Sequence, residues 1–363
     1  MNSRISGSKL WFTAISAAAI FGATPAASHP QTPPTLTEMI RTYAGAHDFS
    51  GTVLVARDSE VLAVESFGLA ERAFGVPAAN NTRYRIASIT KLFTSTLLMQ
   101  MVDRREVDLQ SSVRTYLPDY AGDPSVTVHS LLNHTSGIPN PDAGADPERG
   151  VPLYQLPHTP AQLVSEYASA APVHLVGTHF DYSNADYFVL GRIIEVVAGK
   201  PFDEVLQTRI LDPLELKDTG MLRQRDIVPR LAASYFRLGD DQPLINDLPV
   251  YADNWFAAGA MYSDADDLLA FADALYEGSM ISTESLNRML TPGLDDYGYG
   301  LWIWDIEANG RNYPAYVRFG GIMGANGVVY RVDGADVTVV ILSNTNLTDM
   351  GDFARHIAQA VLD

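Results

Sequence analysis

Strand-like patterns stand near both ends of the chain, and they constrain the fold more than any other feature of the sequence. Near the start, residues 50–56 and 61–66 are rich in apolar residues and flank a short polar turn, which is typical of a β-hairpin. Near the end, residues 327–332 and 337–342 flank Asp333-Gly334, a strong signal for a hairpin with a two-residue loop. We therefore expect one antiparallel sheet to which both ends of the chain contribute.

Helical periodicity dominates the chain between the hairpins, and residues 35–46 and 349–362 also predict helices. No Gly/Ser linker, charge block or repeat divides the sequence. The prediction is an α+β fold in a single domain. It comprises residues 29–363, with a sheet lobe of about residues 29–85 and 290–363 and an inserted, mostly helical lobe of about residues 86–289. Because clefts often form between lobes, we expect the active site at the seam.

The first 28 residues have the features of a secretory signal peptide. A basic start with Arg4 and Lys9 precedes a short apolar run at residues 10–23 and small residues that end in Ala26-Ala-Ser28. A membrane anchor is the alternative, but spanning a bilayer takes roughly 20 apolar residues and this run is shorter. We expect cleavage after Ser28, a secreted or periplasmic protein, and no stable membrane insertion once residues 1–28 are removed.

Composition narrows the classes of partner. The 363 residues include no cysteine, which excludes disulfides, thiolate nucleophiles and cysteine-based metal sites. The formal net charge of −18 would repel phosphate backbones, so nucleic acid is not expected as a partner. The closest histidine pairs, His129/His134 and His174/His179, are five positions apart and would face different sides of a helix. We therefore expect neither a metal nor a cofactor.

A candidate nucleophile stands at Ser88. Residues 86–94 predict the start of a helix, with Ser88 in its first turn and Lys91 on the same face. A serine hydroxyl becomes reactive when a neighbouring group takes its proton, and amide groups at a helix N-terminus can stabilise an oxyanion. A serine cap followed by a surface lysine would produce the same pattern.

A second candidate element is the triplet Tyr182-Ser-Asn184. A phenol and an ammonium both have ordinary pKa values of about 10, so neither is a base at neutral pH without help. In a partly desolvated cleft, nearby cations favour the phenolate and burial favours the neutral amine. Taken alone, Tyr182 is equally compatible with the edge of a core and Asn184 with a turn.

Together, Ser88-x-x-Lys91, Tyr182-x-Asn184 and a Gly-Gly motif before a C-terminal strand resemble the three active-site elements of the serine β-lactamase and penicillin-recognising superfamily. The closer resemblance is to the branch that contains class C β-lactamases, D-alanyl-D-alanine carboxypeptidases and family VIII esterases. It spans about residues 35–360. The supporting stretches are residues 131–137, 180–184, 190–199, 213–220 and 257–263.

The resemblance implies a role for each matching residue. Ser88 would be the acylated nucleophile, Lys91 would assist its deprotonation, and Tyr182 would exchange protons with the attacking and leaving groups. Asn184 would hydrogen-bond the substrate and Lys91. The oxyanion hole would consist of the backbone N–H groups of Ser88 and Gly321.

The third motif departs from the family pattern, because Arg318-Phe319-Gly320 stands where Lys or His, then Thr or Ser, then Gly is usual. Arg318 can maintain a positive field near Tyr182, and it can clamp a substrate carboxylate with two hydrogen bonds. Phe319 replaces a hydroxyl that helps hold a substrate carboxylate in relatives, and we expect it to line the cleft. Lys217-Asp-Thr-Gly220 has a similar pattern but is interpreted as a structural segment.

Two further sets of residues are interpreted as structural. His134 lies in Asn133-His-Thr-Ser-Gly137, which predicts a loop residue rather than a catalyst. Trp255, Trp302 and Trp304 are assigned to packing, since tryptophan is usually buried or half-buried in a core.

The leading hypothesis is an exported serine hydrolase that forms an acyl-enzyme on a small ester or amide substrate. We favour a carboxylic-ester hydrolase because Phe319 weakens the carboxylate handle that β-lactams and D-Ala peptides present. The alternatives are a β-lactamase and a D-amino-acid peptidase or D-Ala carboxypeptidase in which Arg318 grips the terminal carboxylate. An alternative of another class is a non-catalytic homologue that binds peptidoglycan or a protein partner.

Overall fold

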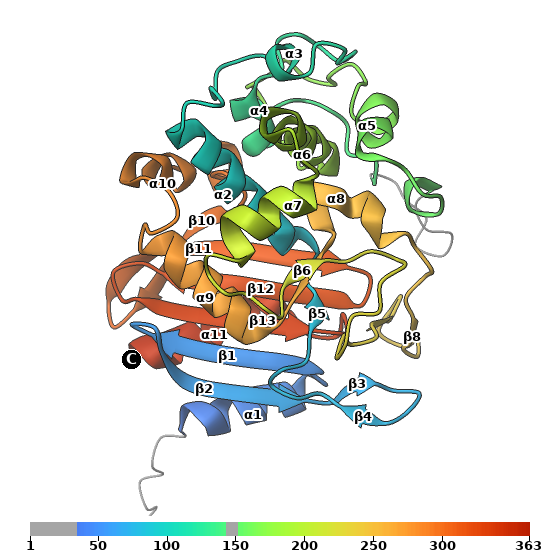
Figure 1. Ribbon diagram of the computed structural model, residues 1–363. Helices are drawn as coiled ribbons and strands as arrows, with labels where there is room; N and C mark the ends of the chain where they lie inside the picture. Colours follow the sequence, from blue (N-terminus) through green and yellow to red (C-terminus); the bar gives the residue numbers. More distant parts are fainter. Residues whose placement is uncertain (1–34, 143–151) are drawn as a thin grey trace, which may run out of the picture. The chain divides into compact units, whose positions relative to one another are not determined.

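An antiparallel sheet of six strands organises the residues that the computed structural model describes, which are 35–142 and 152–363 (Figure 1). The predicted signal peptide lies outside these residues. The strand order is β10 (Trp302–Ala308), β11 (Arg311–Ile322), β12 (Ala325–Val332), β13 (Val337–Ser343), β1 (Gly51–Arg57) and β2 (Glu60–Phe67). Because β1 pairs with β13 along its whole length, the two ends of the chain share one sheet, which confirms the predicted α+β architecture.

Both predicted hairpins form, but one loop is longer than expected. β1 and β2 are joined by Asp58-Ser59, and both residues have the positive φ angles that a tight two-residue turn requires. In the second hairpin Val332 pairs with Val337, so the loop has the four residues 333–336 rather than two. The carbonyl of Asp336 accepts the N–H of Asp58, so the extra residues reach the neighbouring hairpin loop.

The central strands β12, β13 and β1 are buried on both faces, because their side chains alternate between two apolar clusters. In β1, Val53 and Val55 belong to the cluster that includes α1 (Leu36–Ala46) and α11 (Met350–Leu362). Leu54 and Ala56 point the other way, into the larger cluster shared with the helical insertion. The sheet therefore lies between a pair of terminal helices and the rest of the protein (Figure 1).

The two terminal helices form where the sequence predicted them. Thr35 caps α1 in a capping box with Glu38, and Asp349 caps α11 through its side chain. The rings of Tyr43 and Phe353 stack with centroids 4.2 Å apart, which joins the two helices beneath the sheet.

The chain between β2 and β10 is mostly helical, as predicted. Its helices are α2 (Thr90–Asp103), α3 (Val113–Tyr116), α4 (Val128–Leu132), α5 (Pro160–Gln162), α6 (Asn184–Ala198), α7 (Phe202–Leu206), α8 (Phe256–Gly259), α9 (Ala265–Tyr276) and α10 (Thr283–Met289). Short strands are β3 (Leu69–Glu71), β4 (Val76–Pro77), β5 (Tyr84–Arg85), β6 (Gly220–Met221), β7 (Tyr235–Phe236), β8 (Ile245–Asn246) and β9 (Met261–Ser263). Single 3₁₀ turns occupy Ala87–Ile89, Pro152–Tyr154, Ala252–Trp255 and Leu294–Asp296, and π-helical turns occupy Leu163–Tyr167 and Gln207–Leu211.

Two helices of the insertion have positions that matter for the site. α2 is buried from Thr90 to Met101, so it runs through the interior rather than over the surface. α9 packs on β13 and β1, and therefore covers the sheet although it falls within residues 86–289 (Figure 1). In the described ranges, 35–142 and 152–363, no helix is both long enough and apolar enough to cross a bilayer.

Candidate active site

Ser88 lies in a strained turn between β5 and α2. The predicted helical start is a 3₁₀ turn at Ala87–Ile89, and the α-helix follows at Thr90. Ala87 has a φ of +45°, a left-handed conformation that is uncommon for a residue with a side chain. The N–H of Ile86 donates to the carbonyl of Met261 at 3.0 Å, which ties the turn to β9. Strained backbone of this kind is frequent at functional sites.

Lys91 is fully buried one helical turn from Ser88, as the spacing predicted. Its ammonium donates to the Ser88 hydroxyl at 3.0 Å, to Oδ1 of Asn184 at 2.6 Å and to the carbonyl of Ala258 at 2.8 Å. All three N–H donors of the cation therefore have acceptors. Burial lowers the pKa of Lys91 to about 8, and the charge of Arg318 acts in the same direction while Tyr182 opposes it.

Tyr182 reaches the same hydroxyl from the segment that precedes α6. Its phenol oxygen lies 2.9 Å from Oγ of Ser88. Burial, the largest influence, would raise the pKa of this phenol, but the charges of Arg318 and Lys91 together with hydrogen bonds to Lys91 and Ser88 lower the pKa to about 8. The hydroxyl oxygen of Ser88 is thus within hydrogen-bond distance of both Lys91 and Tyr182.

Arg318 supplies the second positive charge from β11. It is 1% exposed, and its Nη2 donates to the phenol oxygen of Tyr182 at 2.8 Å. Its Nε donates to the backbone carbonyl of Ser88 at 2.6 Å, and its Nη1 donates to the hydroxyl of Tyr297 at 2.7 Å. Arg318 therefore contacts both the Ser88 turn and the phenol of Tyr182.

The burial of Arg318 does not fit the expectation that its guanidinium clamps a substrate carboxylate. A bidentate clamp on a substrate carboxylate needs an exposed guanidinium edge with two parallel donors. Each nitrogen of Arg318 already donates to a protein group, and the side chain is buried. The structure thus gives Arg318 contacts to Ser88 and Tyr182 rather than an open fork for substrate.

Asn184, at the start of α6, connects Lys91 to Asp142, a residue that belongs to none of the sequence motifs. Its Oδ1 accepts from Lys91, so its Nδ2 is turned toward Oδ2 of Asp142 at 2.5 Å. Asp142 also accepts from the hydroxyl of Tyr154 at 2.8 Å. Burial raises the pKa of the Asp142 carboxyl. No motif signalled Asp142, since it lies in a loop 42 positions before Asn184.

The two glycines that follow Phe319 differ in their surroundings. A Cβ on Gly320 would lie 2.1 Å from the carbonyl oxygen of Ile86, so the strand passes directly against the Ser88 turn. Gly321 is exposed, and a Cβ there would meet Oδ1 of Asn326 at 3.1 Å. A glycine is needed at position 320 because the backbone of β11 passes this close to Ile86, in the turn that contains Ser88. Gly321 follows it in β11 and pairs with Asn326 of β12. It lies beyond residues 311–317, the part of β11 that pairs with β10.

Aromatic side chains line the start of β10 and the end of β11. Phe319 lies on the opposite face of β11 from Arg318 and packs against the cluster of α1 and α11. Its ring contacts Trp302 and Trp304, with centroids 6.1 and 5.8 Å away. Trp302 also stacks with Tyr182, with ring centroids 6.1 Å apart, so it contacts the candidate site and does not only pack the core. The apolar surface beside Tyr182 thus comes from Trp302. The expectation that Phe319 lines the cleft is wrong, because successive side chains of a strand point to opposite faces and Arg318 takes the face toward Ser88.

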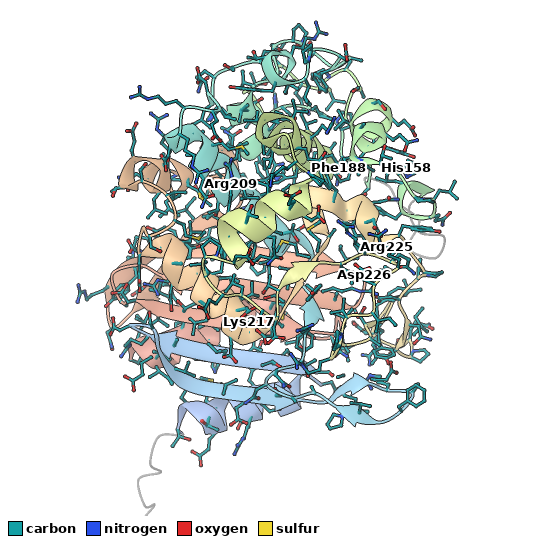
Figure 2. The ribbon with its side chains drawn as sticks, in the orientation of Figure 1. His158, Phe188, Arg209, Lys217, Arg225 and Asp226 are labelled. Carbon is teal, nitrogen blue, oxygen red and sulfur yellow. The ribbon has the colours of Figure 1, made fainter. Side chains whose placement is uncertain are left out.

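Other residues singled out in the sequence lie elsewhere. Lys217, in the segment that leads into β6 and labelled in Figure 2, has a side chain that is 80% exposed, and its ammonium lies 3.4 Å from Oε2 of Glu215. His174 and His179 do not follow helical spacing, because their segment is a loop; their rings stack at 4.3 Å. Within residues 35–142 and 152–363, no group of three or more histidines and acidic residues is arranged to hold a metal ion.

The chain matches the sequence profile of the Beta-lactamase family over residues 36–362. PbpX of Bacillus subtilis, a penicillin-binding-protein relative, is 28% identical over 73% of this chain, and the match spans 65% of PbpX. Esterase EstB of Burkholderia gladioli is 28% identical over 80% of this chain and 85% of its own. The crystal structure of a penicillin-binding protein from Bacillus halodurans is 26% identical with a TM-score of 0.77, covering 89% of this chain and 99% of that one. The chain therefore belongs to the Beta-lactamase family and is a serine hydrolase of the β-lactamase and penicillin-binding-protein type.

Proposed function

We propose that this protein is an exported carboxylic-ester hydrolase in which Ser88 is the nucleophile and Lys91 and Tyr182 transfer protons. The observation that carries the proposal is the convergence of Lys91 Nζ and the Tyr182 hydroxyl on Oγ of Ser88, at 3.0 and 2.9 Å. The pKa values of both groups are lowered to about 8. A group with a pKa this close to neutral pH can act as a general base there.

Tyr182 is the group that we propose accepts the serine proton, after its phenol, which donates to Ser88 in the resting structure, has lost its own proton. Lys91 donates to three acceptors, which suits a cation, whereas the phenol oxygen receives the guanidinium of Arg318. Ser88 Oγ would bond to the ester carbonyl carbon as its proton passes to the Tyr182 phenolate. The backbone N–H groups of Ser88 and Gly321 are the donors we propose for the oxyanion.

Collapse of this intermediate breaks the bond between the carbonyl carbon and the alcohol oxygen, and Tyr182 returns the proton to that oxygen. In the second half of the cycle, water gives its proton to Tyr182 and attacks the acyl carbon. Ser88 then leaves and recovers the proton, which restores the free enzyme and releases the carboxylic acid.

An uncharged ester fits the site better than a peptide with a free carboxylate. The two cations that contact Ser88 or Tyr182, Lys91 and Arg318, are both buried and already hydrogen-bonded to protein groups. The side chain of Trp302 adds apolar surface beside Tyr182. Similarity to EstB supports the same preference.

A panel of three substrates tests the proposed preference. We expect kcat/KM for a short p-nitrophenyl ester to exceed that for nitrocefin and for a D-alanyl peptide. Ser88→Ala is the control, and its rate measures the hydrolysis of the activated ester that does not depend on Ser88. A clear preference for the peptide would replace the esterase with a D-amino-acid peptidase, and a preference for nitrocefin would indicate a β-lactamase. Wild-type protein that turns over none of the three would favour the non-catalytic binder.

Export is the second part of the proposal, and it rests on the basic, apolar and small-residue pattern of residues 1–28. Expression of the full chain in a bacterial host should yield a mature protein whose N-terminus is His29. Intact mass and N-terminal sequencing would show this directly. A cytosolic protein that retains residues 1–28 would contradict the proposal.

A further inference from the structure

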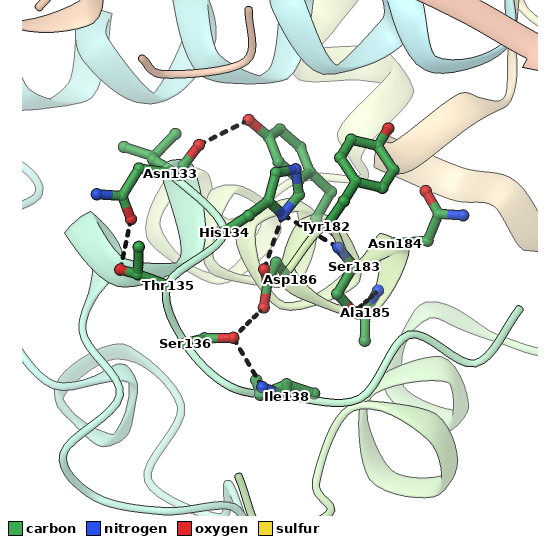
Figure 3. Close-up of polar contacts among 12 residues, drawn as sticks. Asn133, His134, Thr135, Ser136, Ile138, Tyr182, Ser183, Asn184, Ala185 and Asp186 are labelled. Atoms are coloured by element: carbon green, nitrogen blue, oxygen red, sulfur yellow. Dashed lines mark hydrogen bonds and ion pairs between the residues drawn. The ribbon is translucent and has the colours of Figure 1, made fainter. Parts of the chain in front are cut away.

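A second polar pair lies directly beside Tyr182, in a part of the interior that the proposed chemistry does not use. His134 and Asp186 are both fully buried, and Nδ1 of His134 lies 2.8 Å from Oδ2 of Asp186. The imidazole ring packs against the ring of Tyr182, with centroids 4.4 Å apart. Figure 3 shows the carboxyl group between Ser136 and the imidazole, with Tyr182 next to the ring.

The hydrogen bonds at Nδ1 of His134 indicate which atom carries the shared proton. The backbone N–H of Ser183 points at Nδ1 from 3.3 Å, and a backbone N–H can only donate (Figure 3). A ring nitrogen that accepts a hydrogen bond carries a lone pair and no hydrogen. The short contact between Nδ1 and Asp186 then needs its proton on the carboxyl group.

The other side of the carboxyl group is consistent with a neutral acid. Oδ1 of Asp186 accepts from the hydroxyl of Ser136 at 2.5 Å, as the carbonyl oxygen of a carboxylic acid would. The Ser136 hydroxyl also accepts from the N–H of Ile138, so its own hydrogen is free to donate to Asp186. Both oxygens of the carboxyl group thus have a complementary partner when Asp186 carries a proton, whereas Nε2 of His134 is buried with no hydrogen-bond partner among the described residues.

Burial supports neutral forms of both residues. It raises the pKa of the Asp186 carboxyl well above its usual range, against the opposing effects of Ser136 and Lys91. It lowers the pKa of His134, and the charges of Lys91 and Arg318 act in the same direction. The charged and titratable groups around the pair are Lys91 from α2, Arg318 from β11, Tyr187 from α6, Asp181 and Tyr182 from the segment before α6, Tyr297 from the segment before β10, and Tyr120 from the loop after α3.

We propose that Asp186 is a buried, neutral carboxylic acid that donates to Nδ1 of His134, and that this uncharged pair is a positioning unit for Tyr182. The pair fixes His134 as the tautomer with its hydrogen on Nε2. The ring of Tyr182 rests on that imidazole while its hydroxyl reaches Ser88.

The absence of charge on the pair matters for the phenol. An ionised Asp186 would be a buried counter-ion for Lys91 and Arg318, and it would oppose the phenolate of Tyr182. A neutral Asp186 leaves the field of both cations directed at Tyr182, whose pKa they lower. This consequence for catalysis rests on the proposed hydrolase function, whereas the protonation state of the pair does not.

Two spectroscopic measurements on the unliganded enzyme test the protonation state without any substrate. Infrared difference spectra between wild type and Asp186→Asn at pH 7 should contain the carbonyl stretch of a protonated carboxylic acid. Nitrogen-15 spectra of histidine-labelled wild type should show a neutral His134 with an unprotonated Nδ1. A carboxylate band in the difference spectrum, or a His134 signal with hydrogen on Nδ1, would overturn the proposal. The nitrogen spectra keep the test decisive even if the variant fails to fold.

The kinetic test compares three variants by their pH profiles of kcat/KM. Asparagine at position 186 offers the same donor and acceptor as a protonated aspartate. Asp186→Asn should therefore leave the acid limb of the profile, the pH range in which kcat/KM falls as the pH is lowered, in place, and it should retain kcat/KM within about threefold of wild type. Asp186→Val removes both groups and should lower kcat more than it changes KM. Asp181→Asn is the matched control, because its carboxyl is half exposed and close to Asp186.

An ionised Asp186 predicts a different result. Its replacement by asparagine would then remove a buried negative charge and move the acid limb toward lower pH by roughly one unit or more. Such a shift in Asp186→Asn, absent in Asp181→Asn, would refute the neutral pair. If the wild type hydrolyses no ester, the proposed function fails, while the infrared and nitrogen spectra still decide the state of Asp186.

Discussion

Nη2 of Arg318 lies 2.8 Å from the phenol oxygen of Tyr182, so a permanently charged guanidinium stands where a titratable side chain is usual in the family that the sequence resembles. The same side chain donates to the carbonyl of Ser88, which couples the position of the Ser88 turn to that of the phenol. The charge of Arg318 therefore has two consequences, one for the pKa of Tyr182 and one for the geometry of Ser88.

Arg318→Met should move the acid limb of kcat/KM to higher pH. The substitution removes the nearest cation from Tyr182, so burial is no longer outweighed and the pKa of the phenol rises by roughly one to two units. The measurement is ester hydrolysis between pH 6 and pH 10. Arg311→Met, at the exposed start of the same strand, is the control and should leave the profile unchanged. An Arg318→Met profile that coincides with wild type would show that Arg318 does not act on the phenol.

For the wild type, kcat/KM should rise with pH through an apparent pKa near 8. Lys91 and Tyr182 both titrate at about 8 in the free enzyme, and the pair must lose one proton before either group can accept one from Ser88. Activity is consequently lost as the pH falls below about 8. Kinetics of an ester whose own hydrolysis is pH-independent in this range would measure the limb. A profile flat from pH 6 to pH 9 would not fit a base of this kind.

Tyr182→Phe should reduce kcat/KM by roughly 10² to 10⁴, the usual contribution of a positioned general acid or base. The variant keeps the ring that packs on His134 and removes the hydroxyl that lies 2.9 Å from Ser88. Tyr316→Phe removes a hydroxyl bonded to Asp333, away from the site, and serves as the matched control. Comparable activity in the two variants would exclude proton transfer through Tyr182.

Gly320→Ala should impair both folding and activity, because its Cβ would meet the carbonyl of Ile86 at 2.1 Å and displace the Ser88 turn. Gly45→Ala is the comparison, since α1 has open space there and alanine stabilises a helix by about 0.5–1 kcal/mol relative to glycine. Thermal unfolding and ester turnover of both variants would separate the effects. Unchanged stability and turnover in Gly320→Ala would contradict the close contact between β11 and the turn.

Local patterns allowed much of the fold and part of the site to be predicted. Hairpin spacing and apolar runs indicated a sheet shared by both ends of the chain, and the three-residue spacing of Ser88 and Lys91 indicated a common helical face. These features depend on neighbours in sequence, which is why they can be recognised without the fold.

The remaining features depend on contacts between distant segments. Arg318 was expected to bind substrate, but its nitrogens are directed at Ser88, Tyr182 and Tyr297, whose positions only the packing of β11 against the helical insertion determines. Asp142 gave no signal because its partner Asn184 reaches it across a loop. Trp302 was assigned to packing because tryptophan is usually buried, and nothing local placed it beside Tyr182.

The central claim is that Ser88 is the reactive alcohol, and a fluorophosphonate probe tests it most directly. The probe loses fluoride and adds one phosphonyl group to an activated serine, which intact mass and peptide mapping can locate. We predict a single adduct on the peptide that contains Ser88, formed faster at pH 8.5 than at pH 6, and none on Ser88→Ala. Labelling of Ser88→Ala at the wild-type rate, or an adduct at another residue, would contradict this assignment.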